Sequence, residues 1–288
     1  MLAFYVKSIY SIKNSAFFNR TGKVCEDMFS DAERVIYAKR QLLEVICQLR
    51  FPDILKIESA EPAGFQDLIR QSYPQYEKKI EQLPPQVVNG KPVPQGTVNN
   101  YQFISADGQW KVSLTKSFVA LSTHGYVRWE EFAQRLDKIL ASFIELYQPS
   151  WFTRVGLRYV NAFRREALGL EGCLWKELIT PGFLGLMADE DAQESAFLKD
   201  EQTATLQMPG GAKANVKSGP GLLRKVNNRT RETSEERVFM LDLDLYMDSR
   251  IELGQAVPAL NIVHENAGSL FRAAITQTLS DAMEPERA

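Results

Sequence analysis

Short runs in which apolar and polar residues alternate are the strongest constraint on the fold, because such runs form strands buried on one face only. Residues 42–51, 152–162 and 237–246 all show this period of two. Residues 100–105 and 110–115 predict two more strands, joined through Asp107-Gly108, a strong hairpin signal. The second of these two is expected to continue through 118–123.

Two segments of the first half have helical spacing instead. Residues 63–76 and 128–147 repeat apolar side chains every three to four positions, and Pro149 follows the second segment. Residues 83–98 are rich in Pro and Gly and predict a loop. The order over 42–162 is therefore β-α-β-β-α-β, the ferredoxin-like order.

The second half predicts an α-β-β-β-α order. Residues 174–187 indicate one or two short helices, broken at Pro181-Gly182, and a long helix runs from Pro258 to about Met283. Residues 203–208, 212–217 and 237–246 supply the strands. We expect an α+β fold of antiparallel sheets and packed helices, with modules at 31–165 and 166–288.

The N-terminal segment stands apart from both modules. Residues 1–27 are basic and aromatic and show no sustained period. We interpret residues 1–30 either as a poorly ordered tail or as a spurious extension ahead of a start at Met28.

Composition removes several classes of protein. The 34 Lys and Arg nearly balance the 36 Asp and Glu, which argues against coating nucleic acid through bulk charge. Cys25, Cys47 and Cys173 form no CxxC pair, and only two histidines occur, which disfavours disulfide frameworks and zinc sites. No run is long enough for a transmembrane helix, which argues against membrane contact. With no convincing signal peptide and no disulfide pattern, we expect a cytoplasmic protein.

The run VFMLDLDLY (238–246) places Asp242 and Asp244 on one face of a strand. Two such carboxylates can hold Mg²⁺ or share a proton. The other interpretation is the polar side of a half-exposed strand, which alternation with Leu produces anyway. The second interpretation is favoured, and we therefore expect the protein to bind no cofactor.

A second strand carries the opposite charge. In FTRVGLRYVNA (152–162) Arg154 and Arg158 share a face, with Gly156 between them. They are predicted either to grip a phosphate or carboxylate or to pair with Glu44, Asp242 or Asp244 on neighbouring strands. Pairing is favoured if the strands are neighbours. Gln48 and Arg50 extend this face.

Residues 210–231 form a basic segment without acids. It holds Lys213, Lys217, Arg224, Lys225, Arg229 and Arg231. We interpret it as a loop that is either simply solvated or contacts a nucleic-acid backbone or an acidic partner.

The two histidines do not indicate a catalytic set. His124 follows a strand and precedes a helix, where we favour a loop histidine satisfied by the backbone over a general base. His264 is predicted to be a packing residue of the last helix. GxSxG, Walker A, HExxH and GxGxxG patterns are absent from the sequence.

Several motifs together resemble a sporadically distributed, uncharacterised prokaryotic family of about this length. They are LLEVICQLRFP (42–52), RVGLRYVN (154–161), the LDLD strand and HENAGSLFRAAIT (264–276). The resemblance supplies no activity and no catalytic residue. Its patchy occurrence implies an accessory gene, with defence against phage or mobile elements as one role.

The leading hypothesis is a non-enzymatic binding or regulatory module. Its partner would be an anionic ligand, a nucleic acid, another protein or a second copy of this chain. The alternative is a metal-dependent phosphoryl-transfer enzyme, such as a nuclease, in which Asp242 and Asp244 hold Mg²⁺ and the arginines hold phosphate.

Overall fold

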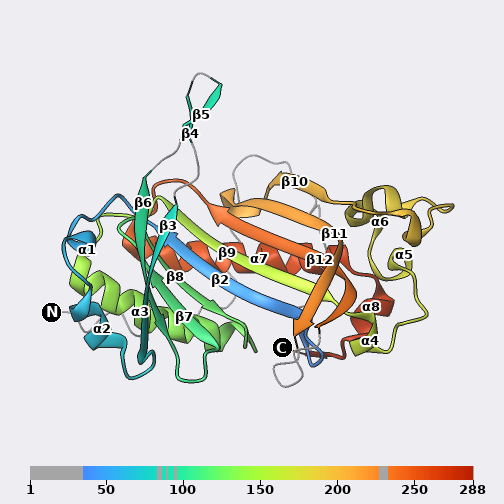
Figure 1. Cartoon of the computed structure of the whole chain (residues 1–288), viewed down its shortest axis with the longest axis horizontal. Coiled ribbons are helices and arrows are strands. Elements are labelled where there is room, and N and C mark those ends of the chain that lie inside the picture. The colour runs from blue at the N-terminus through green and yellow to red at the C-terminus, as the bar shows by residue number, and fades with distance from the viewer. Residues whose placement is uncertain (1–34, 83–85, 89, 94–95, 227–232, 288) are drawn as a thin grey trace, which may run out of the picture.

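The computed structural model describes residues 35–82, 86–88, 90–93, 96–226 and 233–287, and the predicted extension at 1–30 lies outside them. A nine-stranded sheet in the order β10-β11-β12-β9-β2-β8-β7-β6-β3 dominates the molecule (Figure 1), and all its neighbouring strands are antiparallel. The α+β class with antiparallel sheets and packed helices is confirmed.

The elements follow one another without long gaps. The strands are β1 (Val35–Tyr37), β2 (Leu42–Arg50), β3 (Gln75–Gln82), β4 (Gln86–Val88), β5 (Lys91–Val93), β6 (Thr97–Ile104), β7 (Trp110–Leu114), β8 (Phe118–Thr123), β9 (Arg154–Phe163), β10 (Gln202–Gln207), β11 (Lys213–Val226), β12 (Thr233–Met247) and β13 (Pro285–Arg287). The helices are α1 (Lys56–Ser59), α2 (Ala63–Ile69), α3 (Trp129–Tyr147), α4 (Arg165–Leu168), α5 (Trp175–Leu178), α6 (Pro181–Leu184), α7 (Ala256–Ala274) and α8 (Gln277–Ala282), with short 3-10 turns at Gly185–Ala188, Glu194–Ala196, Pro209–Gly211 and Leu253–Gln255.

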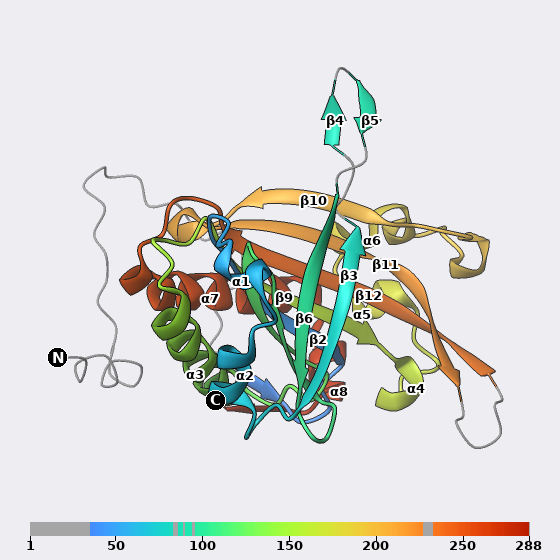
Figure 2. The same ribbon diagram turned by 60° about the vertical axis from the view of Figure 1, so that its left-hand side comes forward.

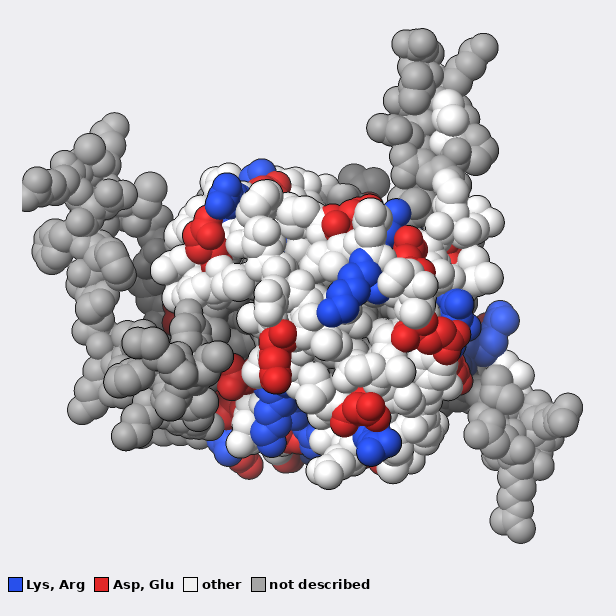
Figure 3. All heavy atoms as spheres, turned by 90° about the vertical axis from the view of Figure 1, so that its left-hand side faces the viewer, with Lys and Arg blue, Asp and Glu red and all other residues white. Residues whose placement is uncertain are grey.

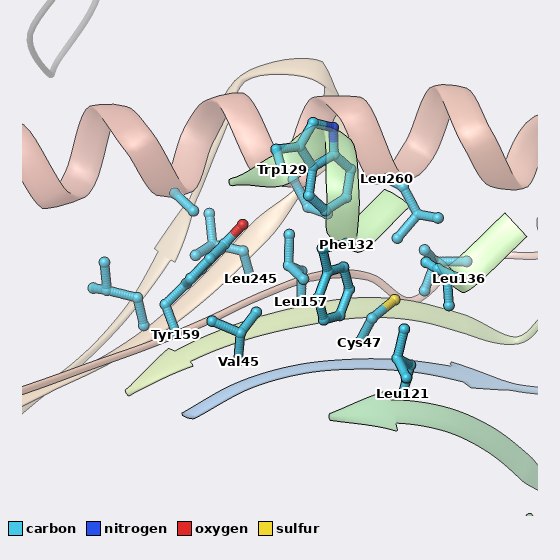
Figure 4. Packing of buried hydrophobic residues seen from close by; sticks show 14 of the residues in the cluster. Val45, Cys47, Leu121, Trp129, Phe132, Leu136, Leu157, Tyr159, Leu245 and Leu260 are labelled. Carbon is cyan, nitrogen blue, oxygen red and sulfur yellow. The ribbon is translucent and has the colours of Figure 1, made fainter. Parts of the chain in front are cut away.

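The long helices α3 and α7 cover one face of the main sheet (Figure 2). The strand side chains on that face are the apolar members of each alternation, such as Cys47, Leu157 and Leu245, and they are almost completely buried. They pack beneath Trp129 and Phe132 of α3 and Leu260 of α7 (Figure 4). The period of two therefore separates a covered apolar face from an open polar one.

The first half contains more strands than the sequence predicted. The helix expected over 63–76 ends at Ile69, and β3 follows Pro74 as a polar edge strand. The strand expected over 110–123 folds back on itself, because Thr115 Oγ1 accepts hydrogen bonds from the backbone N–H groups of Ser117 and Phe118. The order is therefore longer than the ferredoxin-like one.

The second half follows the predicted α-β-β-β-α order, with one break. The helix expected to run to about Met283 stops at Ala274, whose carbonyl accepts a hydrogen bond from the Thr180 N–H at 2.9 Å. Thr276 N–H donates to the Leu178 carbonyl at 2.9 Å. The segment 178–180 thus takes up backbone groups at the end of α7 that a continuing helix would have paired internally. α8 then begins after Thr276.

The predicted boundary between 165 and 166 falls within one continuous sheet. β9 lies before it in the sequence and β12 after it, yet the two strands pair over nine residues, from Phe239–Phe163 to Met247–Val155. This pairing brings the arginine strand and the aspartate strand side by side.

Two further sequence interpretations concern burial and membranes. Cys47 is completely buried, as expected for a cysteine in an apolar run, and burial raises the pKa of its thiol. Among the residues that the structure describes, no helix has both the length and the apolar character needed to cross a membrane.

Candidate binding surface on the open sheet face

The polar faces of β2, β9, β11 and β12 form one surface, which we call the open sheet face. Antiparallel pairing places Arg158 opposite Asp244 on β12 and opposite Ile46 on β2, and it places Lys217 of β11 opposite Asp242. The arginine side chains of β9 and the aspartate side chains of β12 therefore lie on the same face of the sheet. The members of the open sheet face are Glu44, Ile46, Gln48, Arg50, Arg154, Gly156, Arg158, Val160, Lys213, Asn215, Lys217, Met240, Asp242, Asp244 and Tyr246.

Two diagonal ion pairs cross from β9 to β12. Arg158 donates from Nε and Nη2 to the two carboxylate oxygens of Asp242, at 2.7 and 2.5 Å. The hydrogen bond to Asp242 raises the pKa of Arg158 above its usual value. Arg154 donates from Nη2 to both oxygens of Asp244, at 2.8 and 2.9 Å. The favoured sequence interpretation, pairing between neighbouring strands, is confirmed.

Gly156 makes the Arg154 pair possible. A Cβ atom at this position would lie 2.3 Å from Arg154 Nη1, because the guanidinium folds back across Gly156 to reach Asp244. The same guanidinium stacks over the Tyr246 ring, with its carbon 4.5 Å from the ring centroid. The space above Gly156 therefore holds a side chain of the protein's own.

Arg50 stands at the edge of this arrangement with a different environment. It is paired in register with Arg154, and its Nε donates to the Gln48 side chain at 2.8 Å. Partial burial and then the charge of Arg154 lower the pKa of Arg50, and Asp244 only partly opposes them. Asp244 is thus hydrogen-bonded to Arg154 and acts on Arg50 only through its charge.

The basic segment predicted over 210–231 is mostly sheet. Lys213 and Lys217 lie on β11, and Lys213 forms an ion pair with Asp248 at 2.9 Å. Arg224 pairs with Glu235 across the β11–β12 ladder at 2.8 Å. Lys217 is exposed and forms no ion pair within the described part of the chain.

Three further members of that basic segment receive no side-chain description. Lys225 belongs to β11 by its backbone, and its side chain lies outside the description. Arg229 and Arg231 lie outside the described residues altogether.

The geometry does not fit the magnesium alternative. Both carboxylates that it needs, Asp242 and Asp244, accept paired hydrogen bonds from arginines on the next strand. A Mg²⁺ ion would have to displace those cations and would need further oxygen ligands. Within the described residues no group of three or more His, Cys, Asp or Glu side chains is arranged to hold a metal ion.

The histidines occupy two different environments. His124 Nδ1 lies 2.9 Å from the Leu43 carbonyl oxygen, so the loop histidine is satisfied by backbone as expected. His264 lies on the covered side of the sheet, 2.8 Å from the Tyr159 hydroxyl, and its ring stacks on Trp129. It also lines a cavity that the sequence did not indicate.

Charges elsewhere on the molecule are mixed. On the side that carries α1 and α2, basic and acidic side chains alternate and neither sign gathers into a broad patch (Figure 3). The ordered arginine and aspartate rows of the open sheet face differ from this pattern.

No family model matches the chain, and no curated protein is similar enough to match it. The resemblance in the sequence motifs therefore stays a prediction.

Proposed function

We propose that the protein is a non-enzymatic binding module whose open sheet face receives an anionic partner. The observation that carries the proposal is the position of Arg50: it is paired in register with Arg154, it forms no ion pair among the described residues, and the nearby Asp244 is already hydrogen-bonded to Arg154. An anionic group placed beside Arg50 would relieve the repulsion between the two arginines.

Lys217 supports the same proposal from the other side of the ion pairs. It is exposed on β11, next to Asp242, whose charge is already engaged by Arg158. A cation without an ion pair among the described residues thus lies at each margin of the open sheet face, Arg50 on β2 and Lys217 on β11. The two ion pairs between these margins restrict the side chains of Arg154 and Arg158, and groups that are already ordered lower the entropy cost of binding.

A nucleic-acid strand is the anionic partner that we test first, because its phosphates repeat along a line and could contact both margins. Such a partner can make few phosphate contacts here, because most of the described basic side chains of the open sheet face are paired with carboxylates. We therefore expect weak binding with a shallow salt dependence. The accessory role that the sequence resemblance implies belongs to this proposal, as does the cytoplasmic location expected from the composition.

The experiment is a fluorescence-polarisation titration of the full chain with single-stranded RNA and DNA at several salt concentrations between about 50 and 200 mM. We expect affinity to fall with salt, and we expect Arg50→Gln and Lys217→Gln each to weaken binding. Lys138→Gln is the control, because Lys138 is an exposed cation of α3 on the covered side of the sheet. Absent or salt-insensitive binding discards the nucleic-acid version.

An acidic protein would act on the same residues. Polyglutamate competing with the oligonucleotide would show that the surface recognises anionic charge in general. Binding of polyglutamate alone, lost in Arg50→Gln and retained in Lys138→Gln, would assign the face to a protein partner.

A further inference from the structure

A cavity of about 270 Å³ lies on the other side of the sheet from the open sheet face. It is a partly open cavity lined by β1 and residues 40–42, by the segment 126–128, by β9 and β12, and by one side of α7. Its wall is mainly apolar and includes Leu42, Val127, Leu243 and Phe271. This is the size and character of a site for a small molecule with an apolar body.

The charged residues of the cavity are unbalanced. Three arginines, Arg40, Arg128 and Arg272, line it against a single acid, Glu265. Glu265 is exposed, and Arg128 already has Glu130 within 3.5 Å. A cavity with this excess of guanidinium groups attracts a negative charge.

Arg272 is the arginine that lies deepest in this environment. Its Nε is buried and has no hydrogen-bond partner among the described residues, and its Nη2 reaches only the Ser269 hydroxyl, at 3.3 Å. Desolvation lowers the pKa of Arg272, which is the expected effect of burying a cation without a carboxylate beside it. An anion bound here would supply the missing acceptor.

A glycine one turn earlier in α7 lets the Arg272 side chain lie along the helix. The side chain folds back over Gly268, where a Cβ atom would lie 3.1 Å from Arg272 Nη1. Gly268, Ser269 and Arg272 all line the cavity, so the guanidinium borders the cavity.

A second polar group stands at the sheet side of the cavity. The Tyr159 hydroxyl points from β9 toward α7 (Figure 4) and is 2.8 Å from His264 Nδ1. Trp129 stacks on His264 with ring centroids 4.3 Å apart, and Tyr126 meets the Tyr159 ring edge-on. These contacts fix both rings, so the cavity has a preformed polar end within an aromatic wall.

We infer that this cavity binds a small amphipathic anion, an apolar body that carries one carboxylate, with Arg272 as the partner of the carboxylate. The site is separate from the open sheet face and goes beyond the proposed function. The apolar body would lie against Leu243, Phe271 and Val127, where its burial contributes most of the affinity.

The experiment compares probes that share one apolar body. The full chain is titrated by calorimetry with octanoate, octan-1-ol and octyl phosphate. We expect octanoate to bind about ten- to a hundredfold more tightly than octan-1-ol, the range for a hydrogen bond to a charged group. Octyl phosphate distinguishes a carboxylate site from a general anion site, because tighter binding of the phosphate would replace our assignment of the head group.

Arg272→Met removes the charge and keeps a long side chain. We expect this variant to bind octanoate and octan-1-ol equally, whereas Arg70→Met, at an exposed arginine after α2, keeps the wild-type preference. Equal binding of the two probes by the wild-type protein, or no binding of octanoate, overturns the inference. This wild-type comparison decides the matter even if Arg272→Met fails to fold.

Discussion

Gly156→Ala is the perturbation that tests most sharply how the open sheet face is built. The added Cβ would lie 2.3 Å from Arg154 Nη1 and 2.8 Å from Cζ, so the guanidinium has to leave its place. Because Gly156 has no positive φ, Ala fits the backbone itself. The cost therefore comes from the lost contacts of Arg154.

The structure allows a magnitude for that cost. The Arg154 and Asp244 side chains are 20% and 28% exposed, so their ion pair lies near the upper end of the range for surface pairs, about 1 kcal/mol. The stacking of Arg154 on Tyr246 adds about 0.5 kcal/mol or more. Replacing Gly with Ala at a compatible position returns about 0.4–1 kcal/mol through the unfolded chain. We expect a net loss of about 1 kcal/mol in the free energy of unfolding.

The assay is a double-mutant cycle by urea denaturation of wild type, Gly156→Ala, Arg154→Met and the double variant. A methionine at position 154 forms no ion pair with Asp244 that would hold it over Gly156, so Gly156→Ala should raise the free energy of unfolding in the Arg154→Met background. The substitution thus changes sign between the two backgrounds. Equal destabilisation in both would refute the claim that Gly156 serves to admit the guanidinium.

Three further predictions concern single groups. The hydrogen bond from Lys213 holds the pKa of Asp248 below its usual 3.8. The extra thermal stability of wild type over Lys213→Gln should therefore be present at pH 7 and shrink as pH falls below about 4. A stability difference that grows on acidification would contradict this prediction. Native-state alkylation followed by peptide mapping should modify the half-buried Cys173 well before the buried Cys47, and the reverse order would contradict the burial described. Arg272→Met should leave the melting temperature unchanged or raise it, because a desolvated cation is removed, and a clear drop would indicate a partner that the structure does not show.

The sequence predicts the contents of the open sheet face because the strand period is two. Alternation alone places Arg154 and Arg158 on one face of a strand, and Asp242 and Asp244 on one face of another. The diagonal pattern, in which Arg158 meets Asp242 while it lies opposite Asp244, depends on side-chain length and register. The register between two strands, and the reach of a side chain across it, cannot be predicted from the sequence of one strand alone.

Other features depend on contacts between distant segments. β3 was not predicted because QYEKKIEQ is a charged edge strand with little apolar periodicity. The end of α7 at Ala274 depends on hydrogen bonds with Leu178 and Thr180, nearly a hundred positions away in the chain.

The cavity was missed for the same reason. His264 has the spacing of a packing residue on a long helix, and only the fold brings it to Tyr159 and Trp129. Arg272 likewise has no local signal, because its lack of a carboxylate partner among the described residues is a property of the packed structure.

The most direct test of the central claim compares two double variants of the full chain in the salt-dependent oligonucleotide titration. Arg50→Gln with Lys217→Gln removes two cations from the open sheet face, and Arg70→Gln with Lys138→Gln removes two from elsewhere. We predict that only the first pair weakens binding and reduces the salt slope, by about 0.7 for each lost contact to a single strand. Equal loss in both pairs would show that binding follows net charge and not the open sheet face.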